Sequence, residues 1–485
     1  MGSICPQHSG NLEPGRYLLL PDDMRSLISF LRRLSLRWFH HSVQVGLVPV
    51  AAIVLSLLLL NPGDRAPEST FPGPVRIDSA QIDSAQIETR LDTAPALSQP
   101  HTTRLRRPKS EIRGVWITNV ASSVMFSPWG ISRAIGQLSD MQFNTVYPVV
   151  WNRGKTFYRS DVLKQTTGHA IAPLMALMHP TEDPLSEMAR VGHQKQMRVI
   201  PWFEYGFMVP LHSRLARQHP DWLTSRLNGT RRLDESALTT GEEATSGFVS
   251  RLLSSGAPNA LGWLNPLHPE VQRLIGDLVE EVVNRYDVDG IQLDDHFSLP
   301  VEFGYDEYTV RLYQAEHEGR KPPNDEADEE WIQWRADKLT VFVGVLHSRV
   351  KATCPTCIFS VSPNPAKFAY RFHLQDWRTW LENDWLDELV VQVYRDELDR
   401  FNGELAKNTL QAAMDKIPVS IGILTGTWRR PISFEQIKAQ VISSRDHHFS
   451  GVSFFYWDTL WSYFTPESPQ KRRQNFRQLL SEELV

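Results

Sequence analysis

The chain has 485 residues, of which 41% are hydrophobic and 22% are charged. This balance is typical of globular proteins and excludes collagen-like, coiled-coil and wholly disordered chains. The 51 basic and 56 acidic side chains leave a formal net charge of -5, so the chain has no global positive field and we expect no nucleic-acid partner.

The first feature along the chain is an uncharged apolar stretch at residues 43–60. It is long enough to cross a bilayer, and four arginines between positions 25 and 37 precede it. The positive-inside bias therefore predicts a cytoplasmic tail at residues 1–42, a transmembrane anchor, and a main body on the extracytoplasmic side of the cell envelope. A cleavable signal peptide, which would make the protein secreted, is the competing interpretation, but no clear small-residue cleavage site follows Leu60.

Residues 61–110 differ in composition from the rest of the chain. They are rich in Pro, Ser, Thr, Ala and Gln, and they carry the repeat Ile-Asp-Ser-Ala-Gln twice, at 77–81 and 82–86. Such a segment buries too little apolar area to offset its ordering entropy, so we expect a disordered linker.

From residue 111 to residue 485, apolar β-rich runs alternate with amphipathic helical stretches, the pattern of βα units around a parallel sheet. A doubly wound sheet would normally show a Gly-rich first turn, which is absent here, so we expect an α/β fold with a (β/α)8 TIM barrel. The eight predicted strands are 112–119, 144–151, 198–205, 288–295, 358–363, 388–394, 418–424 and 451–457.

The active site of such a barrel lies at the C-terminal ends of its strands. At nearly every one of these ends an aromatic residue stands beside a carboxylate or an amide, a combination that suits sugars because rings stack on pyranoses and polar groups bind hydroxyls. The predicted substrate-binding residues are Trp116, Asn152, Arg153, Trp202, Gln292, His296, Asn364, Gln392, Tyr394, Trp457 and Asp458.

Three carboxylates at strand ends are candidates for catalysis. Asp294 lies two residues after Gln292 on the fourth strand, so both side chains point to the same face of the strand. Asp294 and Asp295 are two acids in succession at the end of an apolar strand, and burying them is costly unless they have a function or contact solvent. Asp295 is either a second catalytic acid or the N-cap of the next helix. Glu204 is the expected partner because its aromatic neighbours would raise its pKa towards that of a general acid, although it could instead bind hydroxyls or pair with Arg153.

An ordered series of motifs stands at and after these strand ends: Arg113-Gly114-Val115-Trp116, Asn152-Arg153-Gly154, Tyr158-Arg159-Ser160, Trp202-Phe203-Glu204, Asn265-Pro266-Leu267-His268-Pro269, Asp289 to His296, Ser362-Pro363-Asn364 and Gln392-Val393-Tyr394. Together these motifs resemble a known family, the glycosyl-hydrolase-like family 10 domain, over most of residues 111 to about 460. Members of that family include divisome-localised glycosidases that cut peptidoglycan glycan strands. The resemblance implies a TIM-barrel glycoside hydrolase that acts on a cell-envelope polysaccharide.

Alternatives to a two-carboxylate hydrolase stay open at this point. An N-acetyl sugar could attack its own anomeric carbon while Asp294 and Asp295 assist it. The barrel could also bind glycan without cleaving it, or Asp294, Asp295 and His296 could hold a metal in a hydrolase or deacetylase, although no further ligand stands at a recognised spacing and we expect no metal or cofactor. Cys354 and Cys357 could form a local disulfide or remain two thiols.

Overall fold

The computed structural model describes residues 111–119, 122, 124–181, 183–233, 260–427, 430–462 and 465–481. The predicted cytoplasmic tail, membrane segment and linker, residues 1–110, lie outside this part of the chain. Among the helices of the described residues, none combines the length and the apolar character needed to cross a bilayer.

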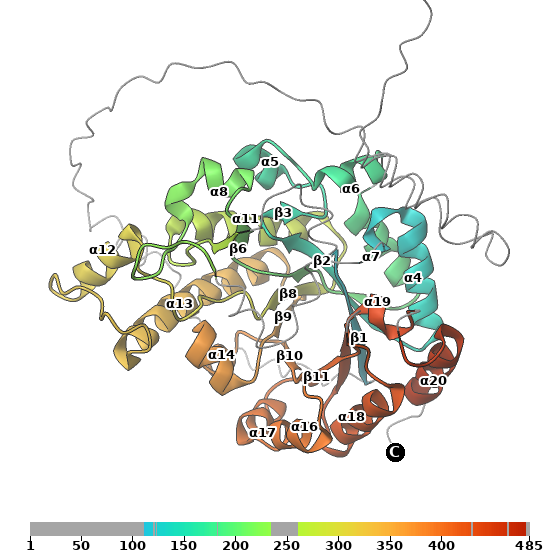
Figure 1. The fold of residues 1–485 in the computed structure, drawn as a ribbon. Helices are drawn as coiled ribbons and strands as arrows, with labels where there is room; N and C mark the ends of the chain where they lie inside the picture. Colours follow the sequence, from blue (N-terminus) through green and yellow to red (C-terminus); the bar gives the residue numbers. More distant parts are fainter. Residues whose placement is uncertain are drawn as a thin grey trace, which may run out of the picture. The chain divides into compact units, whose positions relative to one another are not determined.

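Eight parallel strands close into a barrel within the described residues, which confirms the predicted fold (Figure 1). Each barrel strand pairs with the next one along the chain, and the last strand pairs with the first, so the barrel itself is closed. The short strand β3 (Lys155–Thr156) pairs antiparallel with the end of β2 outside this closed ring. The strands are β1 (Ile112–Ile117), β2 (Thr145–Asn152), the two-part strand β4 (Arg198–Val199) and β5 (Trp202–Phe203), β8 (Gly290–Asp294), β9 (Ile358–Ser362), β10 (Glu388–Gln392), β11 (Val419–Leu424) and β12 (Gly451–Phe455).

The barrel strands are nearly continuous apolar runs because both of their faces are buried. Every residue of β2 is buried, for example. The third predicted strand is divided into β4 and β5 at Ile200 and Pro201, where proline has no N–H to donate to the ladder.

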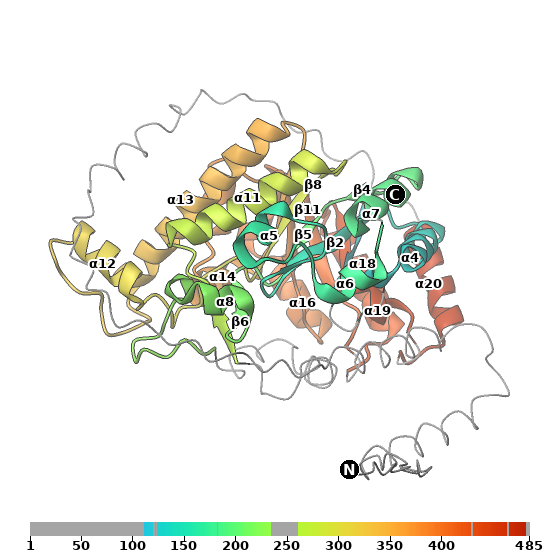
Figure 2. The same cartoon turned by 90° about the horizontal axis from the view of Figure 1, so that it is seen from above.

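Helices cover the outside of the barrel, and α11 and α13 lie side by side there (Figure 2). Several begin at side-chain caps: the hydroxyls of Ser127 and Ser433 each accept a hydrogen bond from a backbone N–H in the first turn. The main helices are α4 (Pro128–Asp140), α5 (Asp161–Thr167), α6 (Pro173–Met178), α7 (Pro184–Gln194), α8 (Arg214–Gln218), α11 (Pro269–Arg285), α12 (Glu307–Glu316), α13 (Glu329–Thr353), α14 (Ala366–His373), α15 (Trp377–Glu382), α16 (Leu398–Leu405), α17 (Asn408–Met414), α18 (Phe434–Asp446), α19 (Trp457–Leu460) and α20 (Pro469–Ser481).

Two smaller features complete the described fold. After β5, the strands β6 (Met208–Pro210) and β7 (Leu261–Trp263) form an antiparallel pair, and residues 234–259 between them lie outside the described part. Cys354 and Cys357 form a disulfide, with Cα atoms 5.3 Å apart, between the end of α13 and the start of β9. Of the two states left open by the sequence, the structure therefore has the disulfide.

The N-terminal end of the barrel buries an ion pair. Glu388, the first residue of β10, accepts hydrogen bonds from Arg198 at 2.8 Å and from the Tyr147 hydroxyl at 3.0 Å. The Ser360 hydroxyl donates a third, at 3.1 Å. This end of the barrel is thus a polar plug, defined by Glu388, Arg198, Tyr147 and Ser360, in which the carboxylate has a charge partner and two hydroxyl donors.

Candidate active site

The backbone brings the ends of β5 and β8 together at the mouth of the barrel. Trp202 pairs in register with Gln292, and Phe203 with Leu293, so continuing the register places Glu204 beside Asp294 on neighbouring strands. The chain then turns sharply through Tyr205 and Gly206, whose φ angles are 57° and 36°. A side chain at position 206 would clash with the backbone around His296, since a Cβ there would lie 2.2 Å from the His296 carbonyl oxygen. Glycine therefore allows the close approach of the two strand ends.

Glu204 is a buried carboxyl group, with only 3% of the residue exposed. The Thr118 hydroxyl lies 2.9 and 2.8 Å from its two oxygens, and the Asn152 amide donates to one of them at 2.7 Å. Burial first, and then the negative charge of Asp294, raises the pKa of Glu204 to about 8, against the opposing effects of these hydrogen bonds and of Arg153. Glu204 therefore holds a proton at neutral pH.

Asp294, the last residue of β8, is also 3% exposed. Gln392 donates to its Oδ1 at 3.2 Å, and the Tyr205 backbone N–H donates to its Oδ2 at 3.3 Å. Burial, followed by the charge of Asp295, raises the pKa of Asp294 to about 6, against the opposing effect of His296. Asp294 is therefore mostly ionised at neutral pH.

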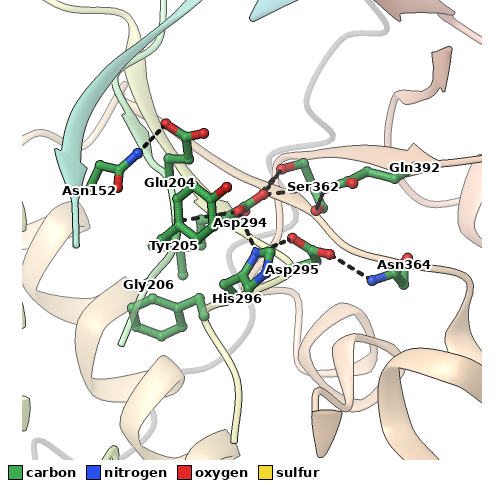
Figure 3. Close-up of polar contacts among 12 residues, drawn as sticks. Asn152, Glu204, Tyr205, Gly206, Asp294, Asp295, His296, Ser362, Asn364 and Gln392 are labelled. Atoms are coloured by element: carbon green, nitrogen blue, oxygen red, sulfur yellow. Dashed lines mark hydrogen bonds and ion pairs between the residues drawn. The ribbon is translucent and has the colours of Figure 1, made fainter. Parts of the chain in front are cut away.

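Asp295 and His296 form an ion pair beside Asp294 (Figure 3). His296 Nδ1 lies 2.8 Å from Asp295 Oδ1 and 3.1 Å from Asp294 Oδ2, and the Asn364 amide donates to Asp295 Oδ2 at 2.7 Å. Burial alone would raise the pKa of Asp295, but the His296 charge holds it well below its ordinary range. Burial alone would lower the pKa of His296, and the two aspartates raise it well above its ordinary value. The N-cap alternative for Asp295 is wrong, because the next helix, α12, begins at Glu307 and is capped by Asp306.

The predicted substrate-binding residues divide into three groups. Asn152, Asn364 and Gln392 lie at the mouth and bind the carboxyls. The Arg153 guanidinium lies there too, 4.5 Å from the centre of the Tyr205 ring. His296 belongs with them, and its ring nitrogen Nδ1 contacts the two aspartates, as given above.

A second group lies inside the barrel. The Trp116 indole N–H donates to Gln292 at 2.7 Å, and the Gln292 amide donates to Ser360 at 3.0 Å. Trp116 and Gln292 are at most 1% exposed, and Trp202 is 2% exposed with its ring 6.3 Å from that of Trp116. These three residues fill the layer beneath the mouth and pack against one another there. Their contact with a sugar stays a prediction.

The third group, Tyr394, Trp457 and Asp458, follows the ends of β10 and β12. Tyr394 packs against Phe455 with ring centres 5.8 Å apart, and Trp457 begins the short helix α19. Asp458 follows it, and burial raises its pKa to about 7. Burial, Asp458 and Glu204 together raise the pKa of Tyr456, so the tyrosine lies within electrostatic reach of both acids.

Several residues of this site were not among the predicted ones. Thr118 follows β1 just as Glu204 follows β5, so applying the strand-end rule to hydroxyls as well as acids would have found it. Tyr205 contributes a backbone N–H, for which a sequence carries no signal. His373 lies beside Asp295 and His296 in space although α14 is distant in sequence, and burial lowers its pKa to about 4.

The cluster of Asp294, Asp295 and His296 is also the candidate for a metal, because one ligand atom from each lies within 4.8 Å of the others. The contacts fit an ion pair better than a metal centre. His296 Nδ1 faces both carboxylates, and a metal bound there would have to displace the proton that holds the three side chains together.

Comparison with known proteins agrees with this architecture. Residues 111–443 match the family described as Glycosyl hydrolase-like 10. Glycosyl hydrolase DigH of Escherichia coli strain K12 is 26% identical over 401 residues, which cover 71% of this chain and 74% of that protein. Glycosyl hydrolase YngK of Bacillus subtilis strain 168 is 22% identical over 323 residues, covering 59% of this chain and 54% of that protein.

Among solved structures, alpha-L-fucosidase isoenzyme 2 from Paenibacillus thiaminolyticus has a similar fold, with a TM-score of 0.50 and 12% sequence identity. The similarity covers 76% of this chain and 49% of that one, and at this identity it concerns the fold alone. The family match spans more than half of the chain and includes the strand ends that carry Glu204 and Asp294. The chain therefore belongs to the glycosyl hydrolase-like 10 family.

Proposed function

We propose that the protein is a glycoside hydrolase in which Glu204 is the general acid and Asp294 is the carboxylate that stabilises the reacting sugar. One observation carries the proposal: two buried carboxyls extend from neighbouring strand ends, with a pKa of about 8 for Glu204 and about 6 for Asp294. Glycoside hydrolysis needs such a pair, one protonated and one ionised at the same pH.

The surroundings of each acid suit its role. Protonated Glu204 donates its proton to the glycosidic oxygen as the bond to the leaving sugar breaks. The Thr118 hydroxyl and the Asn152 amide then donate hydrogen bonds to the carboxylate that remains. Ionised Asp294 faces the positive charge that develops at the anomeric carbon. Water then adds at that carbon, and the proton that it loses replaces the one that Glu204 gave to the leaving sugar.

Asp295 is less suited to either role. The His296 charge holds its pKa well below its ordinary range, so Asp295 cannot supply the proton, and its own charge is already paired with His296 at 2.8 Å while Asn364 donates to its other oxygen at 2.7 Å. A substrate-assisted reaction, in which Asp295 would turn to the acetamide of the sugar, would first have to break these contacts. This favours Glu204 and Asp294 as the reacting pair.

For the substrate we propose a cell-envelope polysaccharide, most specifically the glycan strands of peptidoglycan. The resemblance of the strand-end motifs to the family, which contains peptidoglycan glycosidases, supports this choice. We further propose that residues 43–60 anchor the barrel to the membrane on its extracytoplasmic side. The Cys354–Cys357 disulfide supports that location, because disulfides persist in oxidising compartments.

The test is whether the full chain cleaves isolated peptidoglycan glycan strands. Cleavage is measured by the number of new reducing ends. We expect Glu204→Gln and Asp294→Asn each to lower the rate by about 100-fold to 10,000-fold. Asp287→Asn is the matched control, since Asp287 lies just before β8 at the other end of the barrel and its side chain is 95% exposed.

Wild-type rates in both site variants would contradict the assignment. Binding of the strands by the wild-type protein with no cleavage would favour the non-catalytic glycan-binding barrel.

A further inference from the structure

We infer that His296 and Asp295 form a positioning pair that keeps Asp294 ionised and fixes its orientation. The inference rests on the proposed function, since it concerns how Asp294 is prepared for the reaction. It assigns His296 a role behind the reacting carboxylate in place of direct contact with the sugar.

The geometry carries this assignment. A single ring nitrogen, His296 Nδ1, lies within hydrogen-bond distance of both aspartates, at 3.1 Å from Asp294 and 2.8 Å from Asp295. The shorter contact is to Asp295, whose other oxygen is held by Asn364. Asp295 therefore fixes the imidazole, and the imidazole in turn contacts Asp294.

The packing around the ring keeps it in this orientation. Its centre lies 4.9 Å from that of Tyr205 and 6.1 Å from that of Trp263. The His296 side chain is 16% exposed and that of Asp294 is 4% exposed. Little water therefore competes for the contacts within the cluster.

The charges that face His296 come from several elements. Asp294 and Asp295 carry two negative charges at the end of β8, and the Tyr205 ring that packs against His296 also contacts the Arg153 guanidinium, 4.5 Å from the ring centre. His373, on α14, has a pKa of about 4 and is neutral near pH 7. Two adjacent carboxylates repel each other, and the imidazolium between them offsets much of that repulsion, so Asp294 can be ionised near neutral pH.

The first experiment separates charge from hydrogen bonding by using His296→Asn, whose amide can still donate from about the position of Nδ1. Loss of the positive charge should raise the pKa of Asp294, so the acidic limb of the kcat/KM profile on isolated glycan strands should move up by about 1–3 pH units. KM should change little, because the ring does not touch substrate.

The matched control is His193→Gln. His193 also lies between two aspartates, with Asp289 at 3.0 Å and Asp287 at 3.3 Å, but at the opposite end of the barrel. The acidic limb of the kcat/KM profile of His193→Gln should stay at the wild-type pH. An unchanged limb in His296→Asn, or a large rise in KM with normal kcat, would overturn the inference.

A second experiment does not depend on activity. Nitrogen-15 NMR of the full chain labelled at histidine, with the His296 signals identified by their absence in His296→Asn, reports the protonation of the ring. We expect His296 to remain an imidazolium at pH 7.5. A neutral ring at that pH would overturn the inference even if cleavage is confirmed, whereas a charged ring in a protein that cleaves no glycan would contradict only the proposed function.

Discussion

The two ends of the barrel bury carboxyl groups in opposite ways. At the N-terminal end, Glu388 is 2% exposed and forms an ion pair with Arg198. At the mouth, Glu204 is almost equally buried, but it accepts its hydrogen bonds from a hydroxyl and an amide, and its pKa is raised to about 8. The comparison teaches that burial alone does not make a carboxyl reactive: the partner decides whether it is a fixed charge or a proton donor.

The largest expected difference between the two ends is in activity. Glu204→Gln should lower the rate of glycan cleavage by about 100-fold to 10,000-fold, because the proton donor is lost. Glu388→Gln should leave the rate per folded molecule within about twofold, since Glu388 lies at the other end of the strands. The measurement is the cleavage rate normalised to the folded fraction from circular dichroism. If both variants lost a comparable share of the cleavage rate per folded molecule, the two ends of the barrel would not differ in their contribution to catalysis.

The free energy of unfolding at pH 7 should fall more in Glu388→Gln than in Glu204→Gln. Glu388→Gln leaves Arg198 without its charge partner. Because 28% of the Arg198 side chain is exposed, we expect a loss of about 1–3 kcal/mol, less than for a fully buried ion pair. Urea unfolding monitored by tryptophan fluorescence should therefore show a lower midpoint for this variant at pH 7. An unchanged midpoint would mean that the polar plug contributes little to the stability of the barrel.

Much of this molecule could be predicted from its sequence, and the failures have a physical cause. The eight strands were found because long apolar runs with regular spacing mark strands buried on both faces. Alternation along a strand predicts which residues point inward, but it does not tell how deep they lie. Gln292 and Asp294 share an inward face, yet Gln292 is one layer deeper and binds Trp116.

The same limit applies to the partners of the acids. The sequence predicted the position of Glu204 and the direction of its pKa shift, because aromatic neighbours reduce solvation. It did not predict that Asn364 would donate to Asp295, since this contact joins the residue after β8 to the segment after β9 across 69 residues. Side-chain contacts between strands depend on register and rotamer, which no single motif encodes.

Protonation of Glu204 should also have a smaller effect, on the pH dependence of the free energy of unfolding. The pKa of Glu204 rises from 4.5 to about 8 on folding, so the folded chain binds the proton more tightly. The stabilising effect of that proton is complete below pH 4.5 and is lost as the pH rises through 8. Glu204→Gln should therefore flatten the fall in unfolding free energy across this window, as measured by urea unfolding at each pH. An identical slope in the variant would argue against a protonated Glu204.

The smallest effect is expected at His193. Burial alone would lower the pKa of His193, but Asp289 and Asp287 raise it above the ordinary value of 6.5. Its contribution to stability is therefore present below pH 6.5 and is lost as the pH rises through the folded-state value. His193→Gln should lower the melting temperature slightly at pH 5.5 and leave it unchanged at pH 9. A larger loss at pH 9 would contradict this sign.

The pH profile of kcat/KM for cleavage of isolated glycan strands tests whether Glu204 is the proton donor and Asp294 the ionised carboxylate. Because Asp294 must be ionised and Glu204 protonated, the profile should be bell-shaped, with an acidic limb near pH 6 and a basic limb near pH 8. A rate that stays constant or keeps rising between pH 7 and pH 10 would show that Glu204 does not supply the proton.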